Sequence, residues 1–498
     1  MRWNQLATSP EKLQKVQEET LLSHVRFAQN TEFGRAHGFS SIHSHADFAE
    51  RVPLQSYGDF EPYLERMRKG ATDVLWPGLI PYYGQSSGSS NTAAMHKYLP
   101  ISMEQVRWQQ RAGFDIVARY LDLTGDRTLT GGFFLGLLPP GRVKREGPVG
   151  VASNPGIMQL HVPLPAQLLQ LPKPPLRDVE DYDQKLNLMA DAYLDYDVRA
   201  ITGTSCWFSI MFDKVLEAAH KRGRRVETVS EIWPNLRVLF GGGVPAAPYR
   251  QIINERFGRP LILMDNYNAT EGGLFSATDR LGDPATLMIP DRGVFFEFVP
   301  RAEHGKPNPT RLPLWKVEPH VDYSVALTTS SGLFGYYIGD VIRFSSIFPH
   351  RMEFSGRTGG VLSLTQELTS YLELERAVAQ ASRAQPCTLV DFTASSEAGV
   401  DGTAKGRYLF FMEFEKKPGD ISAFTTALDQ ELCAQNRVYR EHRNKDVAIL
   451  PPVVVPLPKG ATRKFMQQLG LNSLQNKFPR IIDDNRRELL RSFAQSSN

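Results

Sequence analysis

The chain has 498 residues and a formal net charge of +3 at pH 7, with 41% hydrophobic and 22% charged residues. This composition is typical of a globular chain that buries a core, and the length predicts about two to four domains. The small net charge, with no basic block interleaved with aromatic residues, argues against nucleic acid as a partner.

The cysteines and the N-terminal residues indicate a compartment. Cys206, Cys387 and Cys433 are few, odd in number and far apart, which supports neither a disulfide framework nor a zinc cluster. Residues 1–24 are polar and charged, so they favour a capped helix over a signal peptide. No apolar run approaches the roughly 18 residues that a membrane span needs. We therefore expect a cytoplasmic protein with no membrane partner.

The first predicted element is a helix that opens at Ser9 and places Leu13, Leu21 and Val25 close to one face. We expect this helix to pack against the core and to take no part in chemistry. A second helical pattern runs from Met103 to Tyr120.

A run of serine and glycine lies between these two helices, at residues 81–91. Backbone N–H groups and hydroxyls in such a run wrap around a phosphate. The run lacks the lysine-serine ending of a Walker loop, so it is not an ordinary P-loop. A flexible surface loop is the alternative, because glycine and serine are also common turn residues. The candidate phosphate ligands are Ser86, Ser87, Gly88, Ser89 and Ser90.

From residue 193 to residue 263 the sequence alternates apolar strands with helices. This pattern predicts an α/β fold with a largely parallel sheet, whose strand-end loops gather at one edge and form a site. Gly241–Gly243 and Thr270–Glu271 lie at such strand ends. Residues 284–345 have the pattern of short strands, which predicts a barrel or a second sheet.

The pattern changes after Arg357, which predicts a domain boundary near residue 358. The following residues predict a compact α+β unit, so we divide the chain into domains of residues 1–357 and 358–498. The expected elements of the second domain are helices at 369–382 and 421–436, and strands at 387–393, 407–415 and 447–455.

Three of these clusters together match the needs of a nucleoside triphosphate. Such a ligand needs hydrogen-bond donors for its phosphates, a carboxylate that holds Mg²⁺ and a carboxylate for the ribose hydroxyls. The serine and glycine run, Glu271 and Asp340 supply one of each. Glu271 is alternatively a helix-start carboxylate favoured by the macrodipole, and Asp340 a turn aspartate after Gly339. Tyr267 offers a flat face to a purine, or else belongs to the core.

The order of these clusters resembles the adenylate-forming superfamily of acyl-CoA synthetases and luciferases. More closely, the chain resembles the acyl acid amido synthetases, the auxin- and jasmonate-conjugating family known by the name Gretchen Hagen. The resemblance covers nearly the whole chain. The supporting motifs are Asn30–Arg35, His37–Phe39, Val52–Leu54, Ser56–Tyr57, Pro62–Tyr63, Ser86–Ser90, Tyr267–Gly272, Tyr336–Val341, Asn436–Arg440 and Gln475–Arg480.

The resemblance implies a fold and an activity. The fold is a large N-terminal domain of helix-flanked mixed and parallel sheets with a barrel-like β subdomain, followed by a smaller α+β domain that rotates. The activity is that of an ATP- and Mg²⁺-dependent ligase with two half-reactions. A carboxylic acid attacks the α-phosphate of ATP to form an acyl-adenylate and pyrophosphate, and an amine, commonly an amino acid, then forms the amide and releases AMP. The protein must stabilise charge on the phosphorus oxygens and exclude water from the mixed anhydride.

The resemblance also implies roles for single residues, each carried over by its position in a matching motif. Lys477 lies in a late lysine motif and is expected to reach into the closed site, with an exposed lysine as the alternative. The other expected roles are a phosphate loop at Ser86–Ser90, an adenine shelf at Gly241–Gly243 with Asn266 and Tyr267, an α-phosphate contact at Thr270, a Mg²⁺ ligand at Glu271, a ribose contact at Asp340 and a hinge arginine at Arg357.

The chain departs from the family pattern in two places. The segment Asn91–His96 before Lys97 is about two residues longer than the family's, so Lys97 is not expected to reach the phosphates. Gly359 and Gln366–Leu368 differ from the family's hinge motifs. These departures keep two alternatives open, namely acyl transfer to a thiol such as coenzyme A, and a nucleotide-binding protein without turnover.

The acyl pocket is expected near Phe208, Met211 and Met158, although the sequence does not identify its lining. Gly203–Ser205 precedes the same helix and either offers N–H groups to a carboxylate or caps the helix.

Overall fold

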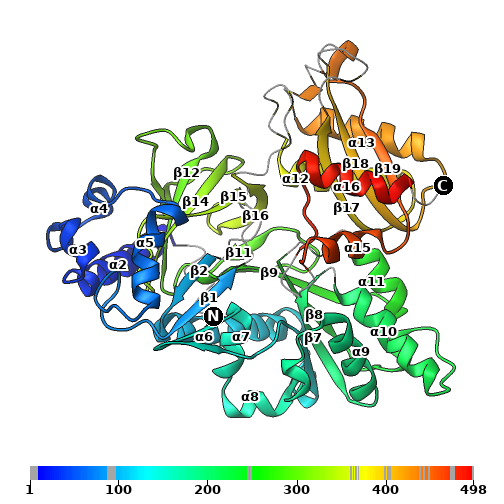
Figure 1. Ribbon diagram of the computed structural model, residues 1–498, viewed down its shortest axis with the longest axis horizontal. Coiled ribbons are helices and arrows are strands. Elements are labelled where there is room, and N and C mark those ends of the chain that lie inside the picture. Colours follow the sequence, from blue (N-terminus) through cyan, green and yellow to red (C-terminus); the bar gives the residue numbers. More distant parts are fainter. Residues whose placement is uncertain are drawn as a thin grey trace.

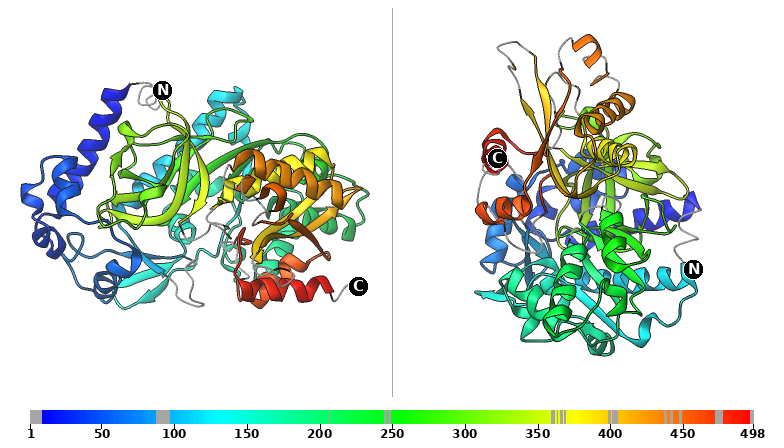
Figure 2. Two further views of the ribbon diagram at one scale, coloured as in Figure 1. Left: turned by 90° about the horizontal axis from the view of Figure 1, so that it is seen from above. Right: turned by 90° about the vertical axis from the view of Figure 1, so that its right-hand side faces the viewer.

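The computed structural model describes residues 9–495, except for residues 87–96, 206, 244–245, 247–248, 359–361, 363, 365–366, 368, 398–399, 401–404, 437–438, 441–442, 447–448 and 472–476. Figure 1 shows a large body that carries the N-terminal helices on one side, and a smaller C-terminal part on the other. In the left view of Figure 2 these helices and the C-terminal part again lie at opposite ends of the molecule.

The helices and strands have the following bounds. The α-helices are α2 (Pro10–Ala28), α3 (Glu32–Ala36), α4 (His45–Arg51), α5 (Tyr57–Arg68), α6 (Met103–Thr124), α7 (Asn154–Leu160), α8 (Leu164–Leu169), α9 (Tyr182–Ala192), α10 (Trp207–Lys221), α11 (Arg250–Phe257), α12 (Tyr371–Ala384), α13 (Ile421–Gln435), α15 (Ala461–Gln468) and α16 (Asp484–Gln495). The strands are β1 (Tyr82–Ser86), β2 (Lys97–Ile101), β3 (Phe133–Leu137), β4 (Lys144–Glu146), β5 (Val149–Ala152), β6 (Gln170–Leu171), β7 (Val198–Thr204), β8 (Val238–Gly242), β9 (Ile262–Ala269), β10 (Gly273–Ala277), β11 (Thr286–Met288), β12 (Val294–Pro300), β13 (Leu312–Pro313), β14 (Asp322–Thr329), β15 (Tyr336–Ser346), β16 (Arg351–Arg357), β17 (Thr388–Glu397), β18 (Arg407–Lys416) and β19 (Val453–Leu457).

A twelve-stranded sheet in the order β13-β12-β14-β15-β16-β11-β10-β9-β8-β7-β3-β6 forms the centre of the large body. Strands β6, β3, β7, β8 and β9 run parallel, as the strand and helix alternation predicts. Successive residues of β8 face opposite sides of this sheet. Leu239 packs in the core under α9–α11, whereas Val238 and Phe240 pack in the core under α6.

The antiparallel half of the sheet contains the short strands expected from residues 284–345. Strands β12, β14, β15 and β16 pair in antiparallel register, and β16 pairs with β11. Hydrogen bonds through β11 and β10 join this half to the parallel half, so the antiparallel strands belong to the same continuous sheet. A separate four-stranded sheet, in the order β2-β1-β5-β4, carries the approach to the serine and glycine run.

The C-terminal part contains a three-stranded sheet in the order β17-β18-β19. Alternate residues of β18 again face opposite sides. Phe410 and Met412 pack in the core that holds residues of α12 and α13, whereas Leu409 and Phe411 pack with residues of α15 and α16. Both cores contain only residues beyond 361. The division of the chain at residue 357 stays a prediction.

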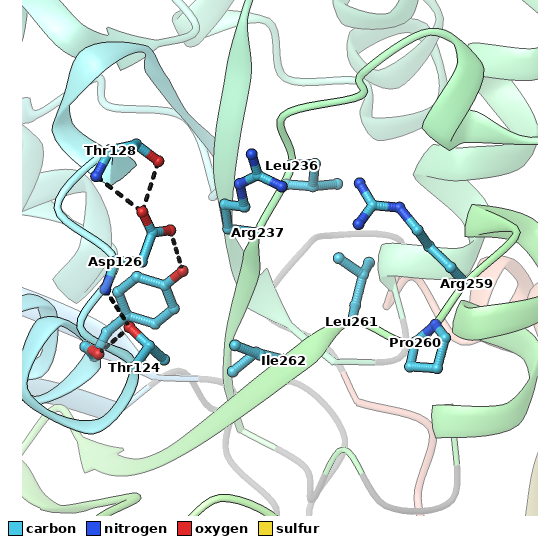
Figure 3. Close-up of a pocket in the computed structure, with 10 residues that line it drawn as sticks. Thr124, Asp126, Thr128, Leu236, Arg237, Arg259, Pro260, Leu261 and Ile262 are labelled. Carbon is cyan, nitrogen blue, oxygen red and sulfur yellow. Dashed lines mark hydrogen bonds between the residues drawn. The ribbon is translucent and has the colours of Figure 1, made fainter.

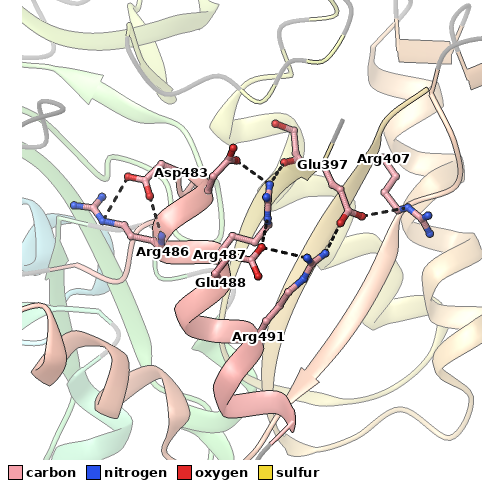
Figure 4. A network of polar contacts seen from close by, with 9 residues as sticks. Glu397, Arg407, Asp483, Arg486, Arg487, Glu488 and Arg491 are labelled. Atoms are coloured by element: carbon pink, nitrogen blue, oxygen red, sulfur yellow. Dashed lines mark hydrogen bonds and ion pairs between the residues drawn. The ribbon is translucent and has the colours of Figure 1, made fainter. Parts of the chain in front are cut away.

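Helix α16 is held to the C-terminal sheet by a network of charged side chains (Figure 4). Arg491 Nη2 donates to Glu397 Oε1 at 2.5 Å, Arg407 Nε lies 3.5 Å from Glu397 Oε2, and Arg487 Nη1 donates to the carbonyl oxygen of Ser396 at 2.6 Å. Exposed pairs of this kind contribute at most about 1 kcal/mol each, so the buried Leu490 contributes more to holding the helix in place.

The sequence patterns agree with the observed elements near the N-terminus and differ in the C-terminal part. Ser9 caps α2 by accepting a hydrogen bond from Lys12 N, as expected. The last strand of the structure begins at Val453, whereas the sequence pattern places its start at residue 447. The sequence pattern does not predict helices α15 and α16. Over the described residues, every helix is too short or too polar to cross a bilayer.

Candidate active site

The carboxyl ends of β8 and β9 bring two predicted clusters together. Gly242 pairs with Asn266 in the parallel register, and Asn266 Nδ2 donates to the carbonyl oxygen of Gly241 at 2.5 Å. Asn268 Nδ2 donates in turn to Asn266 Oδ1 at 2.8 Å. A β-carbon on Gly242 would lie 2.9 Å from Asn266 Oδ1, so this edge is closely packed and requires glycine. The expected adenine shelf is therefore one connected surface.

Tyr267 and Asp340 are 73 residues apart in sequence and share a short hydrogen bond. Tyr267 Oη donates to Asp340 Oδ2 at 2.5 Å, and Asp340 is 4% exposed. Asp340 lies within β15, opposite Arg357 of β16 in the antiparallel register. The turn alternative for Asp340 is therefore wrong, because a strand position holds this carboxylate. The Arg357 side chain lies outside the described residues.

Thr270 and Glu271 lie in the turn between β9 and β10. A strand follows this turn, so the helix-start alternative for Glu271 is wrong. The Glu271 side chain is buried, and Gln105 Nε2 donates to the carbonyl oxygen of Thr270 at 3.0 Å. A carboxylate in this turn is a candidate ligand for a metal ion.

The serine and glycine run begins beside this turn. A β-carbon on Gly84 of β1 would overlap with Cγ2 of Thr270, so the two backbones approach each other closely. Ser86 ends β1 and pairs with Lys97 of β2. Ser86, the first of the candidate phosphate ligands, therefore lies two positions beyond Gly84, the residue that contacts Thr270. Ser87, Gly88, Ser89 and Ser90 lie outside the described residues.

Lys97 and Lys477 take different directions. The Lys97 ammonium lies 5.5 Å from the centre of the Tyr57 ring, over its face. Lys477 is exposed, yet its Cε lies 2.9 Å and its Nζ 3.3 Å from the position that a β-carbon of Gly243 would take. The late lysine of the C-terminal part thus lies against the glycine segment after β8, and its role in the closed site stays a prediction.

Asp265 is a candidate residue that the sequence analysis missed. Asp265 Oδ2 accepts a hydrogen bond from Ala246 N at 3.1 Å, whereas Oδ1 is buried and has no hydrogen-bond partner among the described residues. Burial raises the pKa of Asp265 to about 6. A β-carbon on Gly241 would lie 2.8 Å from this Oδ1 atom. An acidic residue at the end of the apolar stretch 261–264 was the available signal.

The residues expected near the acyl group have different environments. Phe208 and Met211 of α10 are buried in the core beneath the parallel strands, and Met158 packs against a smaller cluster that includes Ile157. Ser205 Oγ is buried and has no hydrogen-bond partner among the described residues. The hydroxyl of Ser205 therefore caps no described N–H group of α10.

A cavity of about 400 Å³ lies at the opposite end of the parallel strands (Figure 3). It is lined by Leu236 and Arg237, which precede β8, and by Leu261, which precedes β9. The clusters described above lie at the carboxyl ends of the same strands. This cavity is therefore not the candidate site, in agreement with the rule that ligands of parallel sheets bind at the carboxyl ends.

The described residues contain no group of three or more acidic, histidine or cysteine ligands that would hold a metal by protein atoms alone. One carboxylate beside the candidate phosphate segment is nevertheless a suitable donor set for Mg²⁺. This ion keeps several waters and is usually bound by one or two carboxylates together with substrate phosphates. Glu271 fits that role.

Comparisons with known proteins define the class of this protein. A solved structure of 2-hydroxyisobutyryl-CoA ligase in the postadenylation state superposes with a TM-score of 0.61 at 14% identity, covering 98% of this chain and 92% of that one. A solved GH3.15 acyl acid amido synthetase superposes with a TM-score of 0.76 at 19% identity, covering 96% of this chain and 93% of that one. The chain has the adenylate-forming fold, as expected.

Sequence models identify the family. The models of the GH3 family N-terminal, central and C-terminal domains match residues 2–188, 287–357 and 372–486. The chain belongs to the GH3 family, which confirms the resemblance. Jasmonoyl–L-amino acid synthetase GH3.5 of Oryza sativa subsp. japonica is 26% identical over 298 residues, 54% of this chain and 49% of that protein. The match thus spans about half the length of this curated relative.

Proposed function

We propose that this protein is an ATP-dependent ligase that activates a carboxylic acid as an acyl-adenylate and transfers the acyl group to an amine, the amine being an amino acid. The observation that supports this most strongly is the approach of β1 to the turn after β9, together with the hydrogen bond between β9 and β15. These contacts bring Thr270 and Glu271 beside Gly84 and bond Asp340 to Tyr267. Named relatives that join acids to amino acids support the substrate classes.

The proposed first half-reaction forms one bond and breaks another. A carboxylate oxygen of the acid attacks the α-phosphorus of ATP, and the bond from that phosphorus to the bridging oxygen of pyrophosphate breaks. Lys477 and Thr270 stabilise charge on the phosphorus oxygens. Bound Mg²⁺ would neutralise negative charge on the phosphates, and Glu271 is the residue proposed to hold it.

A second set of side chains would hold the nucleoside. Asp340, fixed by Tyr267, accepts hydrogen bonds from the ribose hydroxyls. Asp265 Oδ1 is a buried acceptor without a partner among the described residues, and the amino group of adenine is a donor of the kind it lacks. The two carboxylates therefore offer acceptors to the ribose and to the adenine amino group.

The proposed second half-reaction needs no side-chain nucleophile. The amine nitrogen attacks the acyl carbonyl of the adenylate, loses its proton and displaces AMP. The departures at Gly359 and Gln366–Leu368 lie outside the described residues, except Glu367. Glu367 is buried and accepts hydrogen bonds from Tyr408 Oη at 2.5 Å and Leu364 N at 2.6 Å. These partners place Glu367 within the C-terminal part.

Carboxylate-dependent exchange of pyrophosphate into ATP tests the proposal. The protein is incubated with ATP, Mg²⁺, labelled pyrophosphate and pools of carboxylic acids, and we expect label in ATP with at least one pool. Glu271→Gln is the matched negative control, because it keeps the shape of the side chain and removes its charge. Exchange that is equal with and without acid, or absent with every pool, would contradict acyl-adenylate formation.

We also propose a reducing compartment such as the cytoplasm. Cys387 and Cys433, the described cysteines, are both free thiols.

A further inference from the structure

A buried arginine lies where the C-terminal part meets the large body. Arg480 is 5% exposed and bonds to two carboxylates of its own part, those of Glu375 in α12 and Asp391 in β17. Its Nη1 also donates to the carbonyl oxygen of Phe392 at 2.9 Å. Its Nη2 donates to Tyr249 Oη of the large body at 2.6 Å. A guanidinium group this deeply buried needs all of these acceptors.

Tyr249 belongs to the same segment as the glycines of the candidate site. It is 3% exposed, is the N-cap residue of α11, and follows Gly243 by six positions. Its hydroxyl accepts from Arg480 and donates to Asp391 Oδ1 at 3.3 Å. The hydroxyl of Tyr249 therefore bridges the cation and one of its counter-ions.

The residues between Lys477 and Arg480 are held firmly in the C-terminal part. Phe478 is buried against Phe465, with ring centroids 5.7 Å apart. The carbonyl oxygen of Arg480 accepts from Ala394 N at 2.8 Å, and Ile482 N donates to the carbonyl oxygen of Ala394 at 3.0 Å. Arg480 follows Lys477 by three positions, a reach of about 10 Å in extended chain. The position of Arg480 thus limits where the Lys477 ammonium goes.

Two contacts therefore join the same two segments. Gly243 contacts Lys477, and Tyr249 contacts Arg480. The large body and the C-terminal part also contact each other farther along α11, where Arg256 Nη2 donates to Glu415 Oε1 at 2.9 Å. The Tyr249 contact is the one that shares a chain segment with the lysine.

We propose that Tyr249 and Arg480 are positioning residues that hold Lys477 over the Gly243 segment for adenylate formation. This inference rests on the proposed function. The hydroxyl of Tyr249 fixes the guanidinium, the guanidinium fixes its segment, and the segment directs the lysine. Amide formation from an adenylate already made does not need the lysine in this position.

Tyr249→Phe tests this inference, because it removes the hydroxyl and keeps the buried ring. We expect carboxylate-dependent pyrophosphate exchange to fall about 10- to 100-fold, the range for a lost hydrogen bond to a charged group, with KM for ATP unchanged. The rate of amide formation from a chemically made acyl-adenylate should stay within about twofold of wild type, which also shows that the variant is folded. Tyr196→Phe, at an exposed ring, is the matched control and should match wild type in both assays.

A double-mutant cycle separates positioning from general structural damage. If Tyr249 acts through Lys477, then Tyr249→Phe should cost little further exchange in a Lys477→Ala background. Equal fold losses in the wild-type and Lys477→Ala backgrounds, or equal losses in both half-reactions, would overturn the inference. A wild-type protein without exchange for any acid would instead contradict the proposed function, so the two failures are distinct.

Discussion

Tyr267 Oη donates a 2.5 Å hydrogen bond to Asp340 Oδ2, which ties the end of β9 to the middle of β15. The bond crosses strands β10, β11 and β16 of the sheet order and connects its parallel half with its antiparallel half. One strand places the candidate base shelf and the other the candidate ribose contact, so this pair sets the width of the nucleoside site.

Removing the Tyr267 hydroxyl should weaken nucleotide binding. In Tyr267→Phe, Asp340 loses a charge-assisted hydrogen bond, so we expect KM for ATP to rise about tenfold. Asp340→Ala removes the ribose acceptor itself and should raise KM further. Steady-state exchange kinetics at varied ATP concentrations measure both effects. A change in kcat at constant KM in Tyr267→Phe would argue against a binding role.

Glu271→Gln should suppress adenylate formation sharply. The amide keeps the volume of the side chain and removes the negative charge that we propose binds Mg²⁺. We therefore expect the rate of pyrophosphate exchange to fall about 100-fold or more at millimolar Mg²⁺ concentrations. A Mg²⁺ titration should show a higher half-saturating concentration in the variant. Glu318→Gln, at an exposed glutamate, is the control. An unchanged Mg²⁺ dependence in Glu271→Gln would exclude Glu271 as the ligand.

The two lysines should behave differently. Lys97 directs its ammonium over the Tyr57 ring, whereas Lys477 contacts the Gly243 segment. We expect Lys97→Ala to change pyrophosphate exchange less than about threefold, because the Lys97 ammonium packs over the Tyr57 ring in a cation–π contact. The rate of pyrophosphate exchange should fall about 100-fold in Lys477→Ala if the charge of Lys477 stabilises the transition state. Similar losses in the two variants, measured side by side, would show that Lys97 also reaches the phosphates.

Asp265 should make stability depend on pH. Its folded-state pKa of about 6 lies above the ordinary value of 3.8 for an aspartate, so the folded protein binds the proton more tightly than the unfolded chain. Stability from this group is therefore lost as pH rises from about 4 through about 6. We expect Tm of Asp265→Asn, relative to wild type, to be higher at about pH 7.5 than at about pH 4.5, as measured by calorimetry in the two buffers. A Tm difference that is the same at both pH values would contradict a raised pKa at this position.

Local patterns predicted three of the five parallel strands, β7, β8 and β9, and missed β3 and β6. Strand and helix alternation from residue 193 to residue 263 corresponds to β7, α10, β8, α11 and the start of β9. Position along a strand then predicted that Gly241–Gly243 and Thr270–Glu271 lie at strand ends on one edge, because parallel strands end together. This part of the site needed no knowledge of distant contacts.

The remaining features depend on contacts between distant residues. The sequence left Glu271 open between a helix start and a metal ligand, and only the pairing of β9 with β10 shows that no helix follows. The Tyr249–Arg480 contact joins residues 231 apart, which no local pattern encodes. Asp265 was missed because its significance comes from a buried oxygen without a partner among the described residues, and burial is a property of the packed chain.

The most direct measurement of the central claim is mass spectrometry of the complete reaction. The protein is incubated with ATP, Mg²⁺, pooled carboxylic acids and pooled amino acids, and a parallel reaction replaces the amino acids with coenzyme A. We predict AMP together with the mass of an acid–amino acid amide, formed by wild type and not by Glu271→Gln. Thioester in the parallel reaction with no amide in the first would contradict the amine acceptor, and tight ATP binding without AMP formation in either reaction would contradict catalysis altogether.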